Sequence, residues 1–326
     1  MSTAQPVSLS SGVPVTFTFE GCRLVGSLHH PERAVPYRPA VVLFNQGPVD
    51  RGGAHRLYIK LTAHLTALGF TVFRFDARGI GESEGLFTGE LTPPLSVPDA
   101  YGLIQRGAWV PDARAAIAYL NTTHRIDKVI LGGLCGGAVT AFLTGSDHPA
   151  VVGMFGIGTP LTFTASTMRV ADLPEAVIQR DTIGYLKKLV NPSAWGRFLS
   201  FQTDYKTLVK VFATQIQRRL GRTTVADPAA ETDDKVNLPL IRSLNEAGTR
   251  GKRVLLVYSE NDYLWQEYTE ESWRFQKTGR LPFDLSTIAD ANHTLTEQPW
   301  QDALFTTLRA WITPAASDEV RRRRSA

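Results

Sequence analysis

The sequence predicts an α/β protein: a doubly wound, mostly parallel sheet with a helical cap inserted after the sixth strand. Short apolar runs alternate with segments of helical periodicity from residue 40 to residue 157, and again from residue 253 to residue 312. A strand, helix, strand rhythm of this kind forms parallel strand pairs joined by right-handed crossovers. The rhythm stops between these two regions. Because the strands on either side of the gap look alike, one domain with an insertion explains the pattern better than two independent domains.

The first half of the chain contains the first six predicted strands. Residues 15–30 alternate apolar and polar side chains around Glu20-Gly21, which is typical of an antiparallel hairpin. Continuous apolar runs then predict buried strands, and apolar residues at helical spacing predict the helices between them. The strands are 40–44, 71–75, 128–131 and 151–157, and the helices are 56–68, 111–120 and 136–144.

The insertion and the C-terminal part complete the predicted architecture. Residues 175–189 and 205–220 have helical periodicity with polar and Pro-containing breaks between them, so a mostly helical cap is expected. The strand and helix rhythm then resumes with strands at 253–259 and 283–288 and helices at 265–275 and 300–312. The predicted division is a core at 1–160 and 251–314, a cap at 161–250 and a basic tail at 315–326.

The amino-acid composition is typical of a globular protein. Hydrophobic residues make up 43% of the chain and charged residues 20%, the balance of a globular protein with a large core. The N-terminus lacks the basic start and apolar stretch of a signal peptide, and no segment approaches the roughly 20 apolar residues of a membrane span. The net charge is only +4, part of it in the terminal RRRRSA segment. We therefore expect a cytoplasmic protein without membrane or nucleic-acid partners.

A glycine-rich turn holds one of only two cysteines in the chain. Residues 133–137 read GLCGG between a predicted strand and a predicted helix, which fits the G-x-nucleophile-x-G elbow. The nucleophile of such an elbow has a strained backbone, and side chains two positions before and after it would collide. The free N–H groups and the dipole of the following helix stabilise a thiolate. Cys135 is therefore the predicted nucleophile. The alternatives are a buried structural cysteine and a phosphate-binding loop, neither of which requires this symmetric glycine spacing.

A nucleophile of this kind needs a base, and the base needs an orienting acid. The order nucleophile, acid, histidine places the acid after a late strand and the histidine after the last strand. Strand 253–259 runs into Glu260-Asn261-Asp262, and strand 283–288 is followed by His293. We assign His293 as general base and then general acid, and Asp262 as the residue that holds its tautomer and stabilises the imidazolium. Asp262 is also a good helix N-cap, and Glu260 is the competing acid.

The oxyanion hole is expected to combine the backbone N–H of Gly136 with a donor from the loop after strand 40–44. That loop reads Asn45-Gln46-Gly47-Pro48. Because proline has no N–H, the second donor is the backbone of Gln46, Gly47 or Val49, or the side-chain amide of Gln46. No cofactor and no metal is expected for this chemistry.

Four segments carry a resemblance to a known family: residues 47–85, GLCGGA, SENDYLW and DANHTLTE. Together they resemble an α/β-hydrolase of the serine-aminopeptidase-like (hydrolase-4) group, and within it the exosortase-system-associated hydrolases, whose elbow is similar to G-[LW]-C. The resemblance implies the α/β-hydrolase fold and a structural role for residues 75–83. Two positions depart from the family's pattern: Gln46 replaces the His of a His-Gly oxyanion motif, and Cys135 replaces the usual serine. These departures argue against a simple esterase or peptidase.

Three functions are compatible with these residues. An acyl-cysteine reacts with water, amines or thiols, so the first hypothesis is an acyl-cleaving hydrolase for esters or thioesters. The second is a cysteine-dependent acyltransferase or cyclase in a biosynthetic pathway, and the third is a non-catalytic small-molecule binder on the same fold. The expected partner is a small-molecule acyl substrate. Basic side chains of the predicted cap suit a coenzyme A or carrier-protein thioester, or form a solvated helix face. They are Lys187, Lys188, Lys206, Lys210, Arg218 and Arg219.

Overall fold

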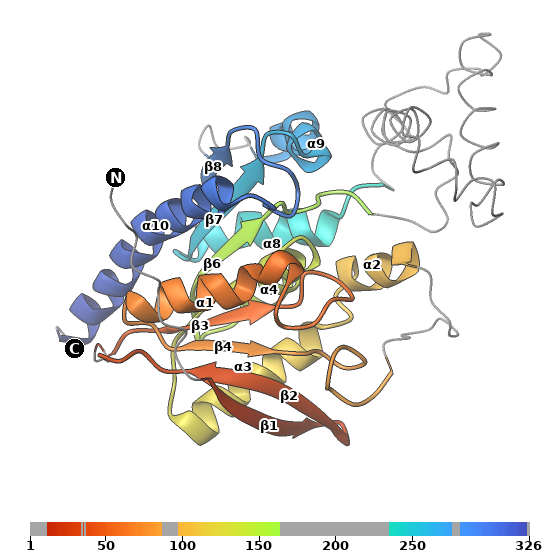
Figure 1. Ribbon diagram of the computed structural model, residues 1–326. Helices are drawn as coiled ribbons and strands as arrows, with labels where there is room; N and C mark the ends of the chain where they lie inside the picture. The colour runs from red at the N-terminus through yellow and green to blue at the C-terminus, as the bar shows by residue number, and fades with distance from the viewer. Residues whose placement is uncertain are drawn as a thin grey trace, which may run out of the picture. The chain divides into compact units, whose positions relative to one another are not determined.

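A computed structural model describes residues 12–33, 35, 37–86, 97–163, 235–275 and 281–324. Within this part, the chain forms an eight-stranded sheet with the order β1-β2-β4-β3-β5-β6-β7-β8 (Figure 1). The hairpin of β1 (Val13–Phe19) and β2 (Cys22–His29) is antiparallel, and β2 also pairs antiparallel with β4. All other neighbouring strands are parallel. The predicted doubly wound, mostly parallel sheet is confirmed.

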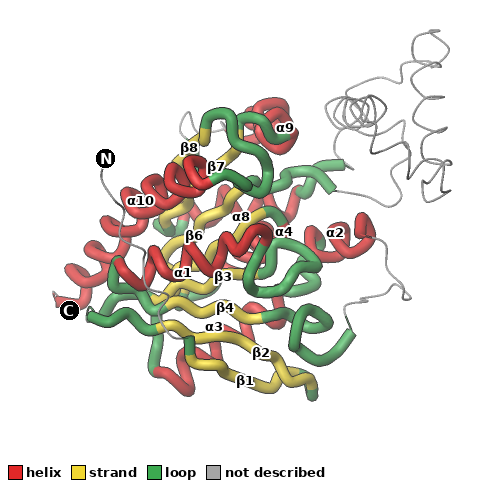
Figure 2. Tube along the Cα trace, in the orientation of Figure 1, coloured by secondary structure: helices red, strands yellow, loops and turns green. Residues whose placement is uncertain are grey.

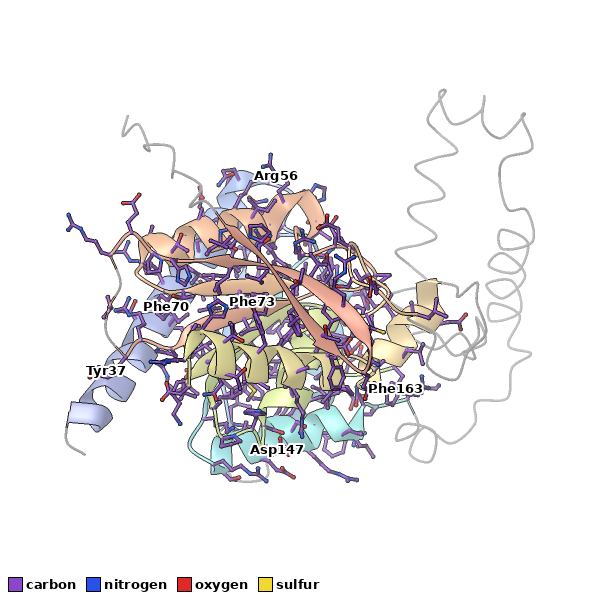
Figure 3. All side chains as sticks on the ribbon, turned by 90° about the horizontal axis from the view of Figure 1, so that it is seen from below. Tyr37, Arg56, Phe70, Phe73, Asp147 and Phe163 are labelled. Atoms are coloured by element: carbon purple, nitrogen blue, oxygen red, sulfur yellow. The ribbon has the colours of Figure 1, made fainter. Side chains whose placement is uncertain are left out.

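The central strands are buried on both faces. Every residue of β3 and β5 is buried, as expected for apolar parallel strands that helices cover on both sides. Phe73 on β4, labelled in Figure 3, has no exposed surface, and its ring lies 6.2 Å from that of Tyr119 on α3. The bounds of the six strands after the hairpin are β3 Ala40–Phe44, β4 Val72–Phe75, β5 Val129–Leu134, β6 Val151–Ile157, β7 Arg253–Ser259 and β8 Asp284–Ile288.

Helices form a layer on each face of the sheet (Figures 1 and 2). One core cluster joins the sheet to α1 (Leu57–Ala67) and α10 (Gln298–Arg324). The other joins it to α3 (Val110–His124), α4 (Gly136–Gly145) and α8 (Leu238–Thr249). The remaining described helices are α2 (Val97–Gln105), α9 (Tyr263–Glu271) and the short 3-10 segments η1 (Ala54–Arg56) and η3 (Ser272–Phe275).

Two helices differ from the sequence-based expectation. The sequence analysis expects no helix at residues 97–105, where the structure has α2, which packs against α4. Helix α10 is longer than expected, because it continues through Pro314 to Arg324 and so includes most of the predicted basic tail. No helix in the described ranges has an apolar stretch long enough to cross a bilayer.

The chain divides into two compact units, residues 1–163 with 236–326, and residues 164–235. The first unit contains the sheet and also α8, which packs against α4 and β7 although the sequence analysis places its residues in the cap. The predicted cap helices and the six basic cap residues lie outside the described residues.

A buried carboxylate holds the chain where it enters and leaves the inserted segment. There, Thr162 pairs with Val236 in an antiparallel bridge. Glu267 on α9 is 7% exposed, and it accepts hydrogen bonds from the backbone N–H of Thr162, at 2.8 Å, and of Leu161. Burial raises the pKa of Glu267 to about 7, even though both N–H groups favour the charged form.

This carboxylate predicts a pH dependence of stability. The pKa of Glu267 is about 7 in the folded protein and 4.5 in an exposed glutamate, so the folded state binds more protons between these values. Its stabilising contribution is therefore present below pH 4.5 and is lost as the pH rises through 7. Relative to Glu267→Gln, we expect the melting temperature of the wild type to fall by about 4 °C between pH 5 and pH 8.

Thermal melts of both proteins across this pH range measure the effect. Glu270→Gln is the matched control, because Glu270 is an exposed carboxylate on the same helix. Parallel pH profiles for the wild type and Glu267→Gln would contradict the prediction.

Candidate active site

Cys135 occupies the sharp turn between β5 and α4. Its φ of 53° and ψ of −114° are rare for a residue with a side chain, and such strained residues cluster at functional sites. The N–H of Cys135 donates to the carbonyl of Ile157 on β6 at 2.8 Å. One residue earlier, the N–H of Leu134 donates to the hydroxyl of the buried Tyr58 on α1 at 2.7 Å. These bonds from both sides hold the turn in its strained conformation.

The glycines of the elbow are required by close backbone contacts. A Cβ on Gly133 would lie 2.5 Å from the carbonyl carbon of Gly137, which is closer than real Cβ contacts allow. A Cβ on Gly137 would lie 2.4 Å from the carbonyl oxygen of Phe44 on β3. The collision that the sequence analysis expects two positions before and after Cys135 is confirmed.

Asp262 and His293 meet above the carboxyl ends of β7 and β8. The Nδ1 of His293 lies 2.6 Å from Oδ2 of Asp262, which is 2% exposed. The other carboxylate oxygen, Oδ1, accepts the N–H of Leu264 at 3.3 Å and caps α9. Asp262 therefore contacts His293 with one oxygen and caps α9 with the other. The competing acid, Glu260, is exposed and accepts a hydrogen bond from the hydroxyl of Thr287 instead.

Backbone bonds between the two loops hold His293 in reach of Asp262. The N–H of Asn261 donates to the carbonyl of Ala291 at 3.0 Å, and the side-chain amide of Asn261 donates to the carbonyl of Asp290 at 3.0 Å. The loop after β8 is thus docked on the loop after β7, directly before the histidine. Parallel strands bring these two loops to the same edge of the sheet, where the elbow also lies.

The surroundings of His293 favour its protonated form. Burial disfavours the charged ring, but hydrogen bonding and electrostatic interactions with Asp262 and Cys135 outweigh burial and raise the pKa of His293 to about 10. The imidazolium is therefore present at neutral pH and is lost only as the pH rises through about 10. The three residues predicted to act together, Cys135, His293 and Asp262, are brought together by the fold.

The predicted oxyanion-hole residues also meet, but with a different hydrogen-bond pattern. The N–H of Gly136, expected to be free for substrate, donates to the carbonyl oxygen of Gln46 at 2.9 Å. The side-chain Oε1 of Gln46 accepts the N–H of Ala54, and the N–H of Val49 donates to Gly47 at 2.7 Å. A helix N-terminus has unpaired N–H groups and a positive dipole end, so it attracts the Gln46 carbonyl when the loop turns towards α4. In this conformation the Gly136 donor is occupied.

Part of the chain is similar to a known protein family. Residues 39–180, which include the loop after β3 and the elbow, match the family model described as serine aminopeptidase, S33. The matched range contains strands β3, β4, β5 and β6 of the sheet and the strained turn after β5. The chain has the fold of the α/β-hydrolases. A search of curated proteins found no match.

Solved α/β-hydrolases share the fold of this chain at low sequence identity. An esterase from Pyrococcus furiosus is 17% identical, with 96% of each chain covered and a TM-score of 0.54. The α/β-hydrolase GrgF from Penicillium sp. sh18 is 14% identical, with 94% of this chain and 99% of that chain covered and a TM-score of 0.55. A thioesterase domain from the curacin biosynthetic pathway is 16% identical, covers 92% and 99%, and has a TM-score of 0.51. The resemblance to exosortase-associated hydrolases stays a prediction.

A buried aspartate stabilises the loop that carries Gln46. Asp76, directly after β4, is fully buried, and its Oδ1 accepts hydrogen bonds from the side chain of Asn45 at 3.2 Å and from the N–H of Arg51 at 2.6 Å. The guanidinium of Arg51 forms an ion pair with the other oxygen. This use of Asp76 is consistent with the structural role that the family resemblance implies for residues 75–83.

Tyr101 on α2 is a further residue beside the elbow, and the sequence analysis misses it. A Cβ on Gly47 would lie 2.4 Å from the hydroxyl oxygen of Tyr101, so glycine at this position leaves room for the phenol. Burial, together with the charge of Cys135, raises the pKa of Tyr101 to about 12. No motif in the sequence points to this residue, because α2 itself is not predicted.

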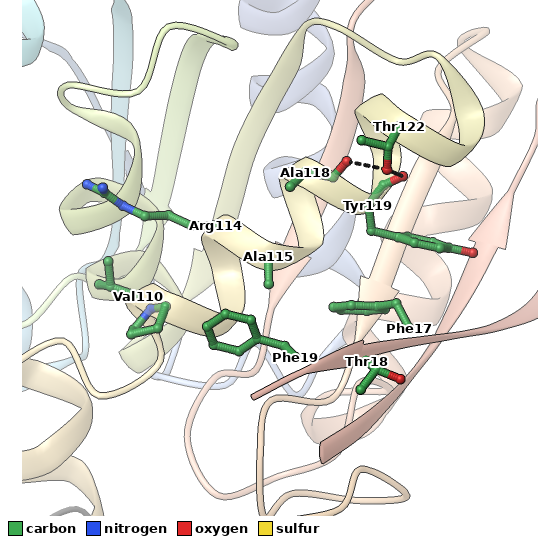
Figure 4. A pocket seen from close by; sticks show the side chains of 10 residues that line it. Phe17, Thr18, Phe19, Val110, Arg114, Ala115, Ala118, Tyr119 and Thr122 are labelled. Carbon is green, nitrogen blue, oxygen red and sulfur yellow. Dashed lines mark hydrogen bonds between the residues drawn. The ribbon is translucent and has the colours of Figure 1, made fainter. Parts of the chain in front are cut away.

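A groove that is separate from the candidate active site lies beside β1. It has a volume of about 900 Å³ and runs between β1 and α3, where Phe17, Phe19 and Tyr119 contribute apolar surface (Figure 4). No residue that lines it belongs to the elbow or to the loops of Asp262 and His293. Among the residues that the structure describes, no three acidic, histidine or cysteine side chains gather in a way that suits a metal ion.

Proposed function

We propose that this protein is an α/β-hydrolase that cleaves esters or thioesters of small-molecule acyl compounds through an acyl-cysteine intermediate. The observation that carries the proposal is the contact of His293 with Asp262, whose Oδ2 lies 2.6 Å from Nδ1, together with the interaction with Cys135 that helps to raise the pKa of His293. A protonated imidazole beside a cysteine at a helix N-terminus stabilises the thiolate, which is the nucleophilic form.

In the first step, the sulfur of Cys135 attacks the carbonyl carbon of the substrate. The new S–C bond pushes the carbonyl π electrons onto oxygen, and a tetrahedral intermediate forms. The intermediate collapses when the carbonyl reforms and the bond to the leaving alkoxide or thiolate breaks. His293 donates its proton to that leaving group, and Asp262 holds the imidazole in the required tautomer.

In the second step, water releases the acyl group. The now neutral His293 accepts a proton from water, and the water oxygen attacks the thioester carbon. The S–C bond breaks, the carboxylic acid product leaves, and the thiolate and imidazolium are restored. The substrate class is supported by similar folds that belong to an esterase and to a thioesterase domain.

Incubation with p-nitrophenyl acetate and with acetyl-coenzyme A tests this function. We expect intact-mass and peptide mass spectrometry to find one acetyl group on Cys135, and the adduct to disappear in water with release of acetate. An adduct that discharges only to an added amine or thiol would identify an acyltransferase instead. Absence of any adduct with either donor would contradict the proposal and favour a non-catalytic binder.

A further inference from the structure

Helix α2 covers the two glycines at which the oxyanion hole is expected. A Cβ on Gly136 would lie 3.0 Å from Cγ2 of Ile104, and a Cβ on Gly47 would lie 2.4 Å from the hydroxyl oxygen of Tyr101. Tyr101 and Ile104 are three residues apart, so they lie on the same face of the helix. This face of α2 therefore contacts both the start of α4 and the loop after β3.

The backbone alone does not provide the expected pair of donors in this conformation. The carbonyl oxygen of Gln46 occupies the N–H of Gly136, and an acceptor oxygen at that place repels the developing oxyanion of a substrate. The loop is held in this arrangement by the bond between Ala54 and the side chain of Gln46, and by the bond from the Asn45 amide to the carbonyl of Val49 at 2.9 Å. A donor other than the N–H of Gly136 is therefore needed beside the elbow.

The Tyr101 hydroxyl has the properties of such a donor. It is half-buried against the core cluster that contains Cys135, and its raised pKa keeps it protonated at neutral pH. None of the hydrogen bonds found in the described part of the chain uses this hydroxyl, so its proton is available to a ligand.

We propose that Tyr101 is a catalytic residue that donates a hydrogen bond from its hydroxyl to the substrate oxyanion after Cys135 attacks. This inference rests on the proposed acyl-cysteine function and adds a side-chain donor to it. As the carbonyl π electrons move onto oxygen, the hydroxyl stabilises the charge that develops there, while the Gln46 carbonyl keeps its bond with Gly136. A side chain at position 47 would collide with the phenol of Tyr101, so glycine at this position leaves space for it.

The test compares Tyr101→Phe with the wild type in two reactions of Cys135. The first is acylation by p-nitrophenyl acetate, which forms an oxyanion, and the second is alkylation by iodoacetamide, which forms none. Loss of one oxyanion donor lowers kcat by about 10²–10³-fold, so we expect a drop of this size in acylation. The rate of alkylation of Cys135, followed by peptide mass spectrometry to separate it from Cys22, is expected to stay unchanged.

The matched control is Tyr119→Phe, which removes a hydroxyl that contacts His124 on α3, away from the elbow. We expect wild-type rates in both reactions for this variant. An unchanged acylation rate in Tyr101→Phe would overturn the role of Tyr101 but leave the acyl-cysteine function intact. Parallel loss of acylation and alkylation would also overturn it, because Tyr101 would then support the thiol rather than the oxyanion. If the wild type itself is not acylated, the proposed function fails and this inference fails with it.

Discussion

Replacing Cys135 with alanine is expected to lower kcat for ester hydrolysis by about 10⁴–10⁶-fold, the range found when a nucleophile is removed from a catalytic triad. The melting temperature is expected to change little. Alanine removes one sulfur atom from a residue that is already 7% exposed, and it keeps the Cβ that the strained turn accommodates. Hydrolysis of p-nitrophenyl acetate and thermal melts measure the two effects. Near wild-type turnover in Cys135→Ala would remove Cys135 from the mechanism.

Two further measurements on variants of Cys135 distinguish its role as a nucleophile from its contact with His293. Cys135→Ser keeps a nucleophilic atom, but a hydroxyl depends more on its base than a thiol does, so we expect a reduced rate rather than complete loss. In Cys135→Ala, the pKa of His293 is expected to fall below about 10, because the hydrogen bond and charge of Cys135 that raise it are removed. NMR titration of the imidazole protons measures this shift. An unchanged titration would mean that the ring does not contact the sulfur.

The strands are the part of the fold that the sequence predicts best. The bounds of β3, β6 and β7 agree with the expected ranges, because each is a continuous apolar run that ends where polar residues or glycine begin. Helix α2 escapes prediction because it is short and because Gly102, in its interior, lowers its intrinsic helix propensity. Its stability comes from packing, shown by the fully buried Ile104. Helix propensity and the local sequence pattern do not include this stabilisation by tertiary packing.

The positions of the candidate catalytic residues follow from topology. Cys135, Asp262 and His293 each follow a parallel strand, and the carboxyl ends of neighbouring parallel strands share one edge of the sheet. Chain order and strand prediction are therefore enough to bring the three together. The orientation of the Gln46 carbonyl, in contrast, cannot be predicted from chain order and strand positions. It depends on how a whole loop is held, through Asp76 and its partners, and no short motif encodes it.

Asp262→Asn is expected to lower kcat by about 10⁴-fold with little loss of stability, because the two oxygens of Asp262 have separate roles. Oδ2 receives the Nδ1–H of His293, and an amide at that place removes the negative charge and presents a donor that favours the wrong tautomer. Oδ1 caps α9 by accepting the N–H of Leu264, and asparagine is as good an N-cap as aspartate. The pKa of His293 is expected to fall in this variant, since Asp262 contributes to raising it.

Asp262→Ala separates the two roles, because alanine removes the cap as well as the charge. Loss of a side-chain N-cap costs about 1 kcal/mol, so urea unfolding is expected to find the alanine variant less stable than the asparagine variant by about that amount. Both variants are expected to be nearly inactive, since neither provides a carboxylate for His293. Equal stability of the two variants would show that Oδ1 does not cap α9 in solution. Wild-type turnover in Asp262→Asn would show that His293 works without a charged partner, and Asp262 would then be a structural residue of the loop after β7.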